Sequence, residues 1–293
     1  MELNTFVVAV FCLVDDWLRG GSKLRQRGPE PELWDSEVLT MEIVGEFLGI
    51  DSEKGLYDYF RRHYGEWFPA LTVTHRTTFT RQMANLWVAK ERLWRELLHR
   101  VSFDPEISLV DSFPVPVCRF ARAYRCRILA EASAFGYDET NKQTFYGLKA
   151  HLRVCWPGVI CAVSLTPANA HDLSVAEELL EGAEGWVVGD RNYWSPELAE
   201  RLKKTEGLAL LAPYKSKKKE REPWPSWLVQ KRRRIETVFS QLVERYEAKK
   251  TWARDRWHLT SRWLRKVLSH TVAIYFCQQV GLSPLSFAQL LIN

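Results

Sequence analysis

Apolar and polar residues alternate with helical spacing over the first third of the chain. Apolar residues recur every three or four positions in 36–50, 52–68 and 74–101, as in a helix with one buried face. Ser36 is a suitable N-cap residue for the first of these runs. The pattern predicts an all-helical N-terminal domain over residues 1–103.

The third helical run opens with a polar and basic turn. Its first residues include His75, Arg76, Thr77, Thr78 and Arg81. In a DNA-binding helix-turn-helix, the N-terminal residues of the recognition helix contact base edges in the major groove. A helix-turn-helix unit is therefore one interpretation of this domain, and a plain helical bundle is the other.

After residue 103 the spacing changes to short apolar runs that alternate with helical ones. Strands are predicted at 107–111, 148–155, 159–165, 186–189 and 208–214. Helices are predicted at 170–184, 195–207, 227–246 and 259–280. A tight turn at 156–158 makes a hairpin, and the later strands alternate with helices as in parallel crossovers. The order predicts a mixed α/β domain over residues 104–293, with a mixed sheet, flanking helices and C-terminal helices.

Basic residues are concentrated in the last third of the chain. Residues 214–266 hold 17 Lys or Arg and 6 Asp or Glu, whereas the net charge of the whole chain is +5. Such a bias is the electrostatic footprint of a protein that binds a polyanion. A solvated helix surface is the alternative.

The cysteines and the apolar runs indicate in which cellular compartment the protein acts. No two of the six cysteines form a C-x-x-C pair, and no histidine stands at zinc-ligand spacing beside them. This usage is typical of reduced thiols in a cytosolic protein. The apolar run at 6–14 is too short to span a bilayer and lacks a basic leader. We expect a cytoplasmic protein without a membrane partner.

Three acidic residues stand where metal chemistry would require them. Asp111 and Asp190 each follow a predicted buried strand, and Glu236 lies on the long basic helix. Acids at the carboxyl ends of neighbouring strands converge at one sheet edge, and Mg²⁺ prefers oxygen ligands. Two such ions can stabilise the attacking and leaving oxygens of a phosphoryl displacement. For any single aspartate, a turn or helix cap is the alternative.

Five stretches, in this order, carry a resemblance to a known family: SLVDSFPVPVCRF, FYGLKAHL, LTPANAHD, VVGDRNYWSP and RRRIETVFSQL. The set resembles the DDE-type insertion-sequence transposases, and most closely the group numbered nine hundred and eighty-two. It extends over residues 105–278, and more loosely over the N-terminal helices. The resemblance implies a ribonuclease-H-like catalytic domain in which Asp111, Asp190 and Glu236 bind two Mg²⁺ ions, with Mn²⁺ as a substitute.

The resemblance also implies DNA contacts. Arg232 matches the arginine that stands four positions before the family's glutamate, and Tyr193 matches the aromatic residue of the second motif. Lys231, Arg233 and Arg234 would neutralise phosphates beside it.

Two positions of the long helix depart from the family pattern. Val229 stands where a tyrosine is often found, and Val243 stands where a lysine is often found. Arg245 or Lys249 could take the place of that lysine.

Three further residues near these motifs have both a functional and a structural interpretation. Lys149 could contact a phosphate, or it could be an ordinary lysine at a sheet edge. Asp172 could support the metal site, or it could cap a helix. Trp194 could stack on a displaced base, or it could pack in the interior.

The activity that the resemblance implies is DNA transposition. The chain would cleave phosphodiester bonds at the ends of an insertion sequence and transfer the freed 3′-OH to target DNA. Its partners would be double-stranded DNA, as terminal inverted repeats and as target, and a second copy of the chain in a homodimer on DNA. It would act in the cytoplasm on the nucleoid. The alternatives are another metal-dependent nuclease of the ribonuclease-H fold and a catalytically silent DNA-binding relative.

Overall fold

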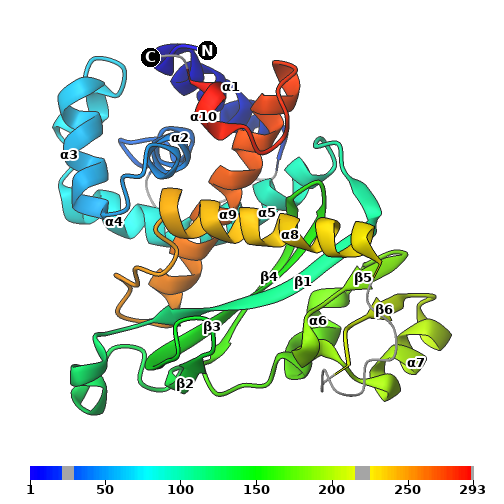
Figure 1. Ribbon diagram of the computed structural model, residues 1–293. Coiled ribbons are helices and arrows are strands. Elements are labelled where there is room, and N and C mark those ends of the chain that lie inside the picture. Colours follow the sequence, from blue (N-terminus) through cyan, green and yellow to red (C-terminus); the bar gives the residue numbers. More distant parts are fainter. Residues whose placement is uncertain (22–29, 215–224, 292–293) are drawn as a thin grey trace. The chain divides into compact units, whose positions relative to one another are not determined.

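The computed structural model describes residues 1–21, 30–214 and 225–291, and within them the chain forms two compact units (Figure 1). The helical unit combines Met1–Ser102, Leu242–Ala248 and Trp252–Asn293. The sheet unit consists of Phe103–Gln241 and Lys249–Thr251. Residues 215–224, which belong to the basic region 214–266, lie outside the described residues.

The helical unit is assembled from both ends of the chain. Its helices are α1 (Leu3–Gly20), α2 (Asp35–Phe47), α3 (Glu53–His63), α4 (Arg76–Asn85), α5 (Trp87–Leu98), α9 (Arg256–Gln279) and α10 (Phe287–Leu290), with the short helix η1 (Pro69–Thr72). The π-helical turn η6 (Gln241–Arg245) leads into this unit from the sheet unit.

Helix α9 is the centre of the helical unit. It packs against α2, α4, α5 and α10, and most of its residues are buried. A helix that is covered on all sides is a core element. The last long helix therefore belongs with the N-terminal helices, whereas the sequence placed it in the domain 104–293. The difference arises because helical periodicity shows that a face is buried without showing which partner covers it.

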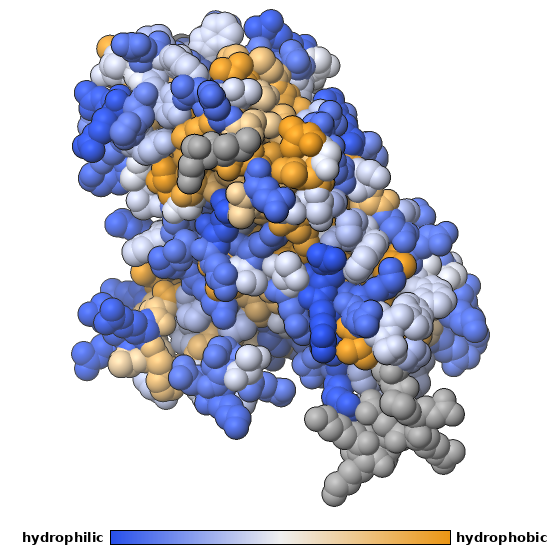
Figure 2. All heavy atoms as spheres, turned by 45° about the horizontal axis from the view of Figure 1, so that its top comes forward, coloured by the Kyte–Doolittle hydropathy of each residue, from blue (hydrophilic) through white to orange (hydrophobic). Residues whose placement is uncertain are grey.

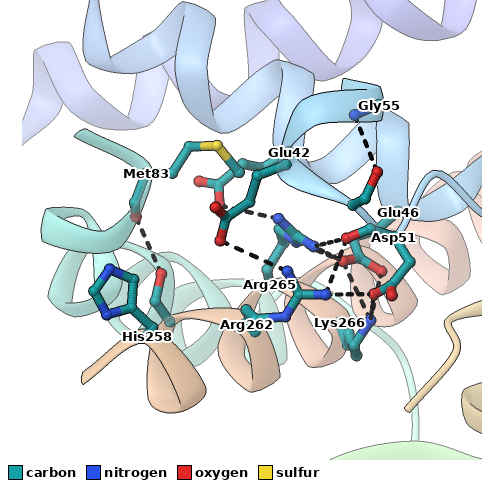
Figure 3. A network of polar contacts seen from close by, with 12 residues as sticks. Glu42, Glu46, Asp51, Gly55, Met83, His258, Arg262, Arg265 and Lys266 are labelled. Carbon is teal, nitrogen blue, oxygen red and sulfur yellow. Dashed lines mark hydrogen bonds and ion pairs between the residues drawn. The ribbon is translucent and has the colours of Figure 1, made fainter. Parts of the chain in front are cut away.

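A network of buried charges joins α9 to the N-terminal helices (Figure 3). Arg265 pairs with Glu46, and Lys266 lies 3.1 Å from Glu46 and 2.9 Å from Asp51. Arg262 lies 2.6 Å from Asp51. Each of these buried cations is paired with a carboxylate and hydrogen-bonded. Removing one partner of such a pair leaves a buried charge without compensation and destabilises the fold by about 3–5 kcal/mol.

The buried network changes the interpretation of the basic region. Arg262, Arg265 and Lys266 are counted among the basic residues of 214–266, yet all are buried against carboxylates. They neutralise the interior of the helical unit and offer no charge to a polyanion. The basic surplus that faces solvent is therefore smaller than the sequence suggests.

The sheet unit contains antiparallel and parallel strands. They are β1 (Asp104–Pro116), β2 (Ala134–Asp138), β3 (Gln143–Trp156), β4 (Val159–Pro167), β5 (Trp186–Val188) and β6 (Ala209–Leu211). The order is β2-β3-β1-β5-β6, and β4 also pairs with β3. Strand β3 is antiparallel to β1, β2 and β4, whereas β5 is parallel to β1 and β6 is parallel to β5. The predicted mixed α/β class is confirmed, and β2 is an element that the sequence did not predict.

Helices cover both faces of β1. Val110 shares an apolar cluster with Val187 and with residues of α6 (Ala176–Leu180) and α7 (Pro196–Thr205). Phe113 contacts Phe239 of α8 (Ser226–Ser240), with ring centroids 4.8 Å apart. Residues at odd separation on a strand point to opposite faces, so α8 covers the face of β1 opposite to α6 and α7.

The described surface is apolar in places, but no described helix could cross a membrane. In Figure 2, apolar side chains gather on the face of the helical unit near α1 and α10, and Val8 of α1 is exposed. None of the helices within the described residues combines the length and the apolar character that a membrane span requires.

Candidate active site

The parallel pairing of β1 and β5 brings two of the predicted acids together. Leu109 of β1 is in register with Val188 of β5. Asp111 and Asp190 each stand two residues beyond this pair. Their carboxylates influence each other, since the charge of Asp190 raises the pKa of Asp111. The sequence predicted that Asp111 ends its strand, but β1 continues to Pro116, and Asp111 is paired with Leu152 of β3 within the strand. Only Asp190 follows the end of its strand, and the parallel register of β1 and β5 brings the two acids together.

Asp111 is a strongly perturbed carboxyl group. Burial is the main cause that raises its pKa, to about 7, and the negative charge of Asp190 adds to it. The backbone N–H of Ser112 donates to Asp111 Oδ1 at 2.8 Å, and Arg232 Nη2 lies 4.0 Å from Asp111 Oδ2. Both contacts favour the ionised form, but they do not offset the burial.

Asp190 is held in place by the turn that follows it. It caps the short helix η4 (Arg191–Tyr193), where its side chain accepts the backbone N–H of Asn192 at 2.9 Å and the side-chain amide at 3.1 Å. Burial raises the pKa of Asp190, and the negative charge of Asp172 raises it further. The turn thus fixes the direction of a carboxylate that is incompletely neutralised.

Asp172 is a third acid of this region, and it is almost fully buried. Lys149 Nζ donates to Asp172 Oδ1 at 2.9 Å, and Ser112 Oγ donates to the same oxygen at 3.3 Å. A helix does begin here, but the cap of the short helix η3 (Asp172–Val175) is the side chain of the preceding residue, His171, and Asp172 is its first residue. The run LTPANAHD, which places an acid after a strand, is the sequence feature that could have indicated Asp172 as an acid of this region.

Lys149 is already engaged within the protein. Besides Asp172 it donates to the carbonyl of Ala170 at 3.0 Å. The ammonium group of Lys149 therefore neutralises Asp172 in this structure. A group held by two acceptors can still lie near a phosphate. The predicted phosphate contact of Lys149 stays a prediction.

Tyr193 lies in the core rather than on the surface. Its side chain belongs to the apolar cluster of Val110 and Val187, and its hydroxyl is buried without a hydrogen-bond partner among the described residues. Burial raises its pKa well above the usual value, and the charges of Asp172, Asp111 and Asp190 act in the same direction. The hydroxyl therefore remains a proton donor near the three carboxylates, whereas the ring has no free face for DNA.

Glu236 is exposed on α8. Within the described parts of the chain, no three His, Cys, Asp or Glu side chains are close enough to hold a metal ion together. Its neighbours on the helix do reach β1: Arg232, one turn earlier, approaches Asp111, and Phe239 packs on Phe113. Residues 232, 236 and 239 share one stripe of the helix, so Glu236 lies on the stripe that faces β1.

The basic run on α8 divides into two groups. Lys231 and Arg234 lie over the ring of Trp156, at 4.0 and 5.1 Å from its centroid. Arg232 is directed to the carboxylates, and Arg233 is exposed. Of the predicted phosphate contacts, Arg233 is therefore the one that the described structure leaves open to solvent.

The aspartate pair fits a hard divalent cation. Asp111 and Asp190 supply carboxylate oxygens, which Mg²⁺ prefers. Burial raises the pKa values of both groups, and the charges of neighbouring acids (Asp190 for Asp111, Asp172 for Asp190) raise them further in spite of Arg232. A bound cation would offset both effects. The unpartnered hydroxyl of Tyr193 is a donor suited to an oxygen ligand of such an ion.

The polar and basic residues at the start of the third helical run lie on α4, which begins at Arg76; its role as a recognition helix stays a prediction. His75 caps it by accepting the backbone N–H of Thr77. Within the helical unit the exposed side of α4 borders a groove of about 710 Å³. The groove is lined by Arg76, Thr77, Thr80, Arg81, Ala84, Asn85, Asp255, Trp257 and His258. Trp194, in the sheet unit, packs against Tyr214 with ring centroids 5.0 Å apart, which agrees with the packing interpretation of this residue; its stacking on a displaced base stays a prediction.

Comparison with known proteins gives one match. A family model described as a transposase DDE domain matches residues 102–256, which include Asp111, Asp190 and Glu236. No curated protein and no solved structure matches the chain significantly.

Proposed function

The chain belongs to the family of transposases with a DDE domain, and on this premise we propose that it cleaves DNA at the ends of an insertion sequence and joins the freed 3′-OH to target DNA. The observation that carries the proposal is the pairing of Asp111 with Asp190 through the β1–β5 register. Two half-buried carboxylates whose pKa values are raised by burial and by neighbouring acids are costly for a fold that does not use them.

The fold assignment is part of the proposal. We assign the sheet unit to the ribonuclease-H-like class. The support is the long antiparallel β1–β3–β4 arrangement, followed by the parallel strands β5 and β6, with α6 before β5 and α7 between β5 and β6 in the chain. The acids stand at the junction of the two parts, where ligands bind in open α/β sheets.

The proposed cofactor is a pair of Mg²⁺ ions, for which Mn²⁺ could substitute. Asp111 and Asp190 would hold them, and Glu236 is the proposed third ligand because its helical stripe faces β1. When bound, such ions activate the attacking oxygen and stabilise the charge on the leaving oxygen.

The residues around the carboxylates set up the site. Asn192 and the turn of η4 orient Asp190, and the backbone of Ser112 orients Asp111. Lys149 neutralises Asp172, so this third acid adds less negative charge beside the DNA. Arg232 supplies positive charge to both aspartates, and it is suited to hold a phosphate near them.

DNA would be bound by both units. In the sheet unit, Arg233 and its basic neighbours on α8 would neutralise DNA phosphates. In the helical unit, α4 would contact base edges of the terminal inverted repeats. Joining two element ends requires two copies of the site, so we propose a homodimer on DNA that acts at the nucleoid.

The test is an oligonucleotide duplex that carries one end of the element, incubated with Mg²⁺. Asp190→Asn removes one carboxylate and keeps the capping oxygen, so we expect DNA binding to persist and cleavage to be lost. Glu236→Gln should behave in the same way. Glu197→Gln, on the exposed side of α7, is the matched control and should cleave normally.

Two outcomes would count against the assignment. Cleavage by Asp190→Asn at the wild-type rate would contradict the role of the aspartate pair. A pre-cut end with a free 3′-OH separates a transposase from a hydrolytic nuclease, because only the transposase joins this end to a target plasmid.

A further inference from the structure

The segment between β1 and β2 carries arginines interleaved with exposed aromatic side chains. It reads CRFARAYRCRI over residues 118–128 and contains the short 3₁₀ helix η2 (Phe120–Arg125). With β2 it forms a surface that we name the arginine–aromatic patch, made of Arg119, Arg122, Arg125, Tyr124, Phe135 and Tyr137. None of these residues has a part in the site described above.

The 3₁₀ geometry gathers the arginines on one edge. A 3₁₀ helix has three residues per turn, so side chains at i and i+3 eclipse each other. Arg122 and Arg125 therefore share an edge, and Arg119 precedes them as the N-cap residue. Ala123 occupies another edge and is buried. All three arginines are exposed.

The charges of these arginines face solvent. Among the residues that the structure describes, no ion pair joins Arg119, Arg122 or Arg125 to a carboxylate. Segment 118–128 itself holds no acid, and Arg127 adds a fourth positive charge. A concentrated positive edge that the protein does not neutralise is complementary to phosphates.

The aromatic residues form a supported platform beside the arginines. The ring of Phe135 lies 5.2 Å from that of Tyr124 and 5.0 Å from that of Tyr146. Tyr124 is 85% exposed and Tyr137 is 58% exposed. Phe135 and Tyr137 stand two apart on β2 and therefore point to the same face.

The patch rests on a fixed base. Ala123 and Leu129 are buried beneath it, and the N–H of Val117 donates to the carbonyl of Tyr146 at 3.1 Å. The N–H of Cys126 closes η2 on the carbonyl of Ala123 at 3.1 Å. Because the backbone is held, a ligand would order only the outer side chains, which reduces the entropic cost of binding.

We propose that the arginine–aromatic patch binds single-stranded DNA, with phosphates on the arginine edge and unpaired bases stacked on Tyr124 and Tyr137. Sequence-tolerant binding of single strands combines a positive groove with exposed aromatic rings. Paired bases in a duplex are already stacked on each other, so the exposed rings favour an unpaired strand. The inference rests on the proposed function, in which strand cleavage at an element end frees a strand.

The first experiment measures the aromatic contribution. A fluorescent oligothymidylate is titrated with the full chain in EDTA, so that no cleavage interferes. Tyr124→Ala should weaken binding by about fivefold to a hundredfold, the range of one base–aromatic stack. Tyr124→Phe should bind like the wild type. A blunt duplex of equal length should bind the wild type and Tyr124→Ala alike.

The second experiment measures the charge contribution. For single strands, the logarithm of the binding constant falls against the logarithm of salt concentration with a slope of about 0.7 per phosphate neutralised. The double variant Arg122→Ala and Arg125→Ala should lower this slope by about 1.4. The matched control Arg201→Ala and Lys203→Ala removes two exposed charges from α7 and should leave the slope unchanged.

Unchanged oligothymidylate affinity in Tyr124→Ala would overturn the proposal, and so would equal losses on the duplex. Equal losses on polyglutamate would also overturn it, because the patch would then be a surface for any polyanion. The assay contains no metal, so its failure is independent of the cleavage test of Asp190.

Discussion

At the scale of single residues, the most informative group is the Asp111 carboxyl. Its pKa lies near 7 because burial and Asp190 disfavour the charge. A folded pKa raised above the unfolded value of about 3.9 means that the folded state holds more protons in between. Stability then falls as pH rises from about 4 to about 7. The candidate catalytic acid therefore destabilises the metal-free fold at neutral pH.

We predict that Asp111→Asn stabilises the metal-free protein at pH 8. The amide removes the buried charge and keeps the oxygen that accepts the N–H of Ser112. The gain in the free energy of unfolding should be on the order of 1–3 kcal/mol. Urea unfolding in EDTA measures it, and the gain should shrink at pH 5, where wild-type Asp111 is protonated. A variant less stable than the wild type at pH 8 would refute the assignment of this pKa.

At the scale of elements, the function of α8 depends on which side chains each of its faces presents. One stripe approaches β1 through Arg232 and Phe239, and Lys231 with Arg234 covers Trp156. The four consecutive basic residues 231–234 thus have three different surroundings. Arg232 lies near a carboxylate, Lys231 and Arg234 lie over an indole ring, and Arg233 is exposed to solvent. The departure at Val243 lies beyond α8, in the π-helical turn η6 that enters the helical unit.

We predict that Arg233→Ala weakens duplex binding without altering the fold. The guanidinium is exposed, so the change removes one phosphate contact and should lower the salt-dependence slope for duplex DNA by about 0.9. Electrophoretic mobility shifts at several salt concentrations measure the slope. Lys203→Ala, an exposed charge on α7, should leave it as in the wild type. A slope that is the same in both variants would exclude Arg233 from the interface.

At the scale of the whole molecule, buried titratable groups link stability to pH. His270 of α9 is fully buried and contacts the ring of Phe287, with centroids 5.1 Å apart. Burial lowers its pKa to about 3. A folded pKa below the unfolded value of about 6.5 means that the unfolded state binds more protons in between. Stability is complete above about pH 6.5 and is lost as pH falls toward 3.

We predict that His270→Phe reduces the acid sensitivity of folding. From pH 7.5 to pH 5, one such histidine costs the wild type about 2 kcal/mol of unfolding free energy. His151, whose pKa burial lowers to about 4, acts in the same direction, so the variant should keep part of the sensitivity. Urea unfolding at the two pH values measures the loss. His99→Gln, an exposed histidine, should lose as much as the wild type, and an equal loss in His270→Phe would contradict the prediction.

Local patterns in the sequence were sufficient for much of the fold. Apolar runs predicted β3 and β4, and helical spacing predicted α2, α3, α7 and α9 close to their observed bounds. The nearness of Asp111 and Asp190 was predicted from apolar runs followed by acids, although β1 continues beyond Asp111 to Pro116. Strand β2 and helix η2 were missed, because their short, exposed segments lack an apolar period. The cap predicted at Asp172 is one residue earlier, at His171, and the burial of Asp172 depends on contacts with distant residues that the sequence does not show.

The sequence by itself determined the class of the elements, the position of two aspartates directly after apolar runs and the family resemblance, because these depend on local spacing and on motif order. Only the tertiary structure decided that α9 joins the helical unit, that Asp172 and Tyr193 surround the aspartates, and that exposed arginines gather beside Tyr124. These facts depend on contacts between residues that are distant in the chain, and burial, pKa and charge pairing are properties of such contacts.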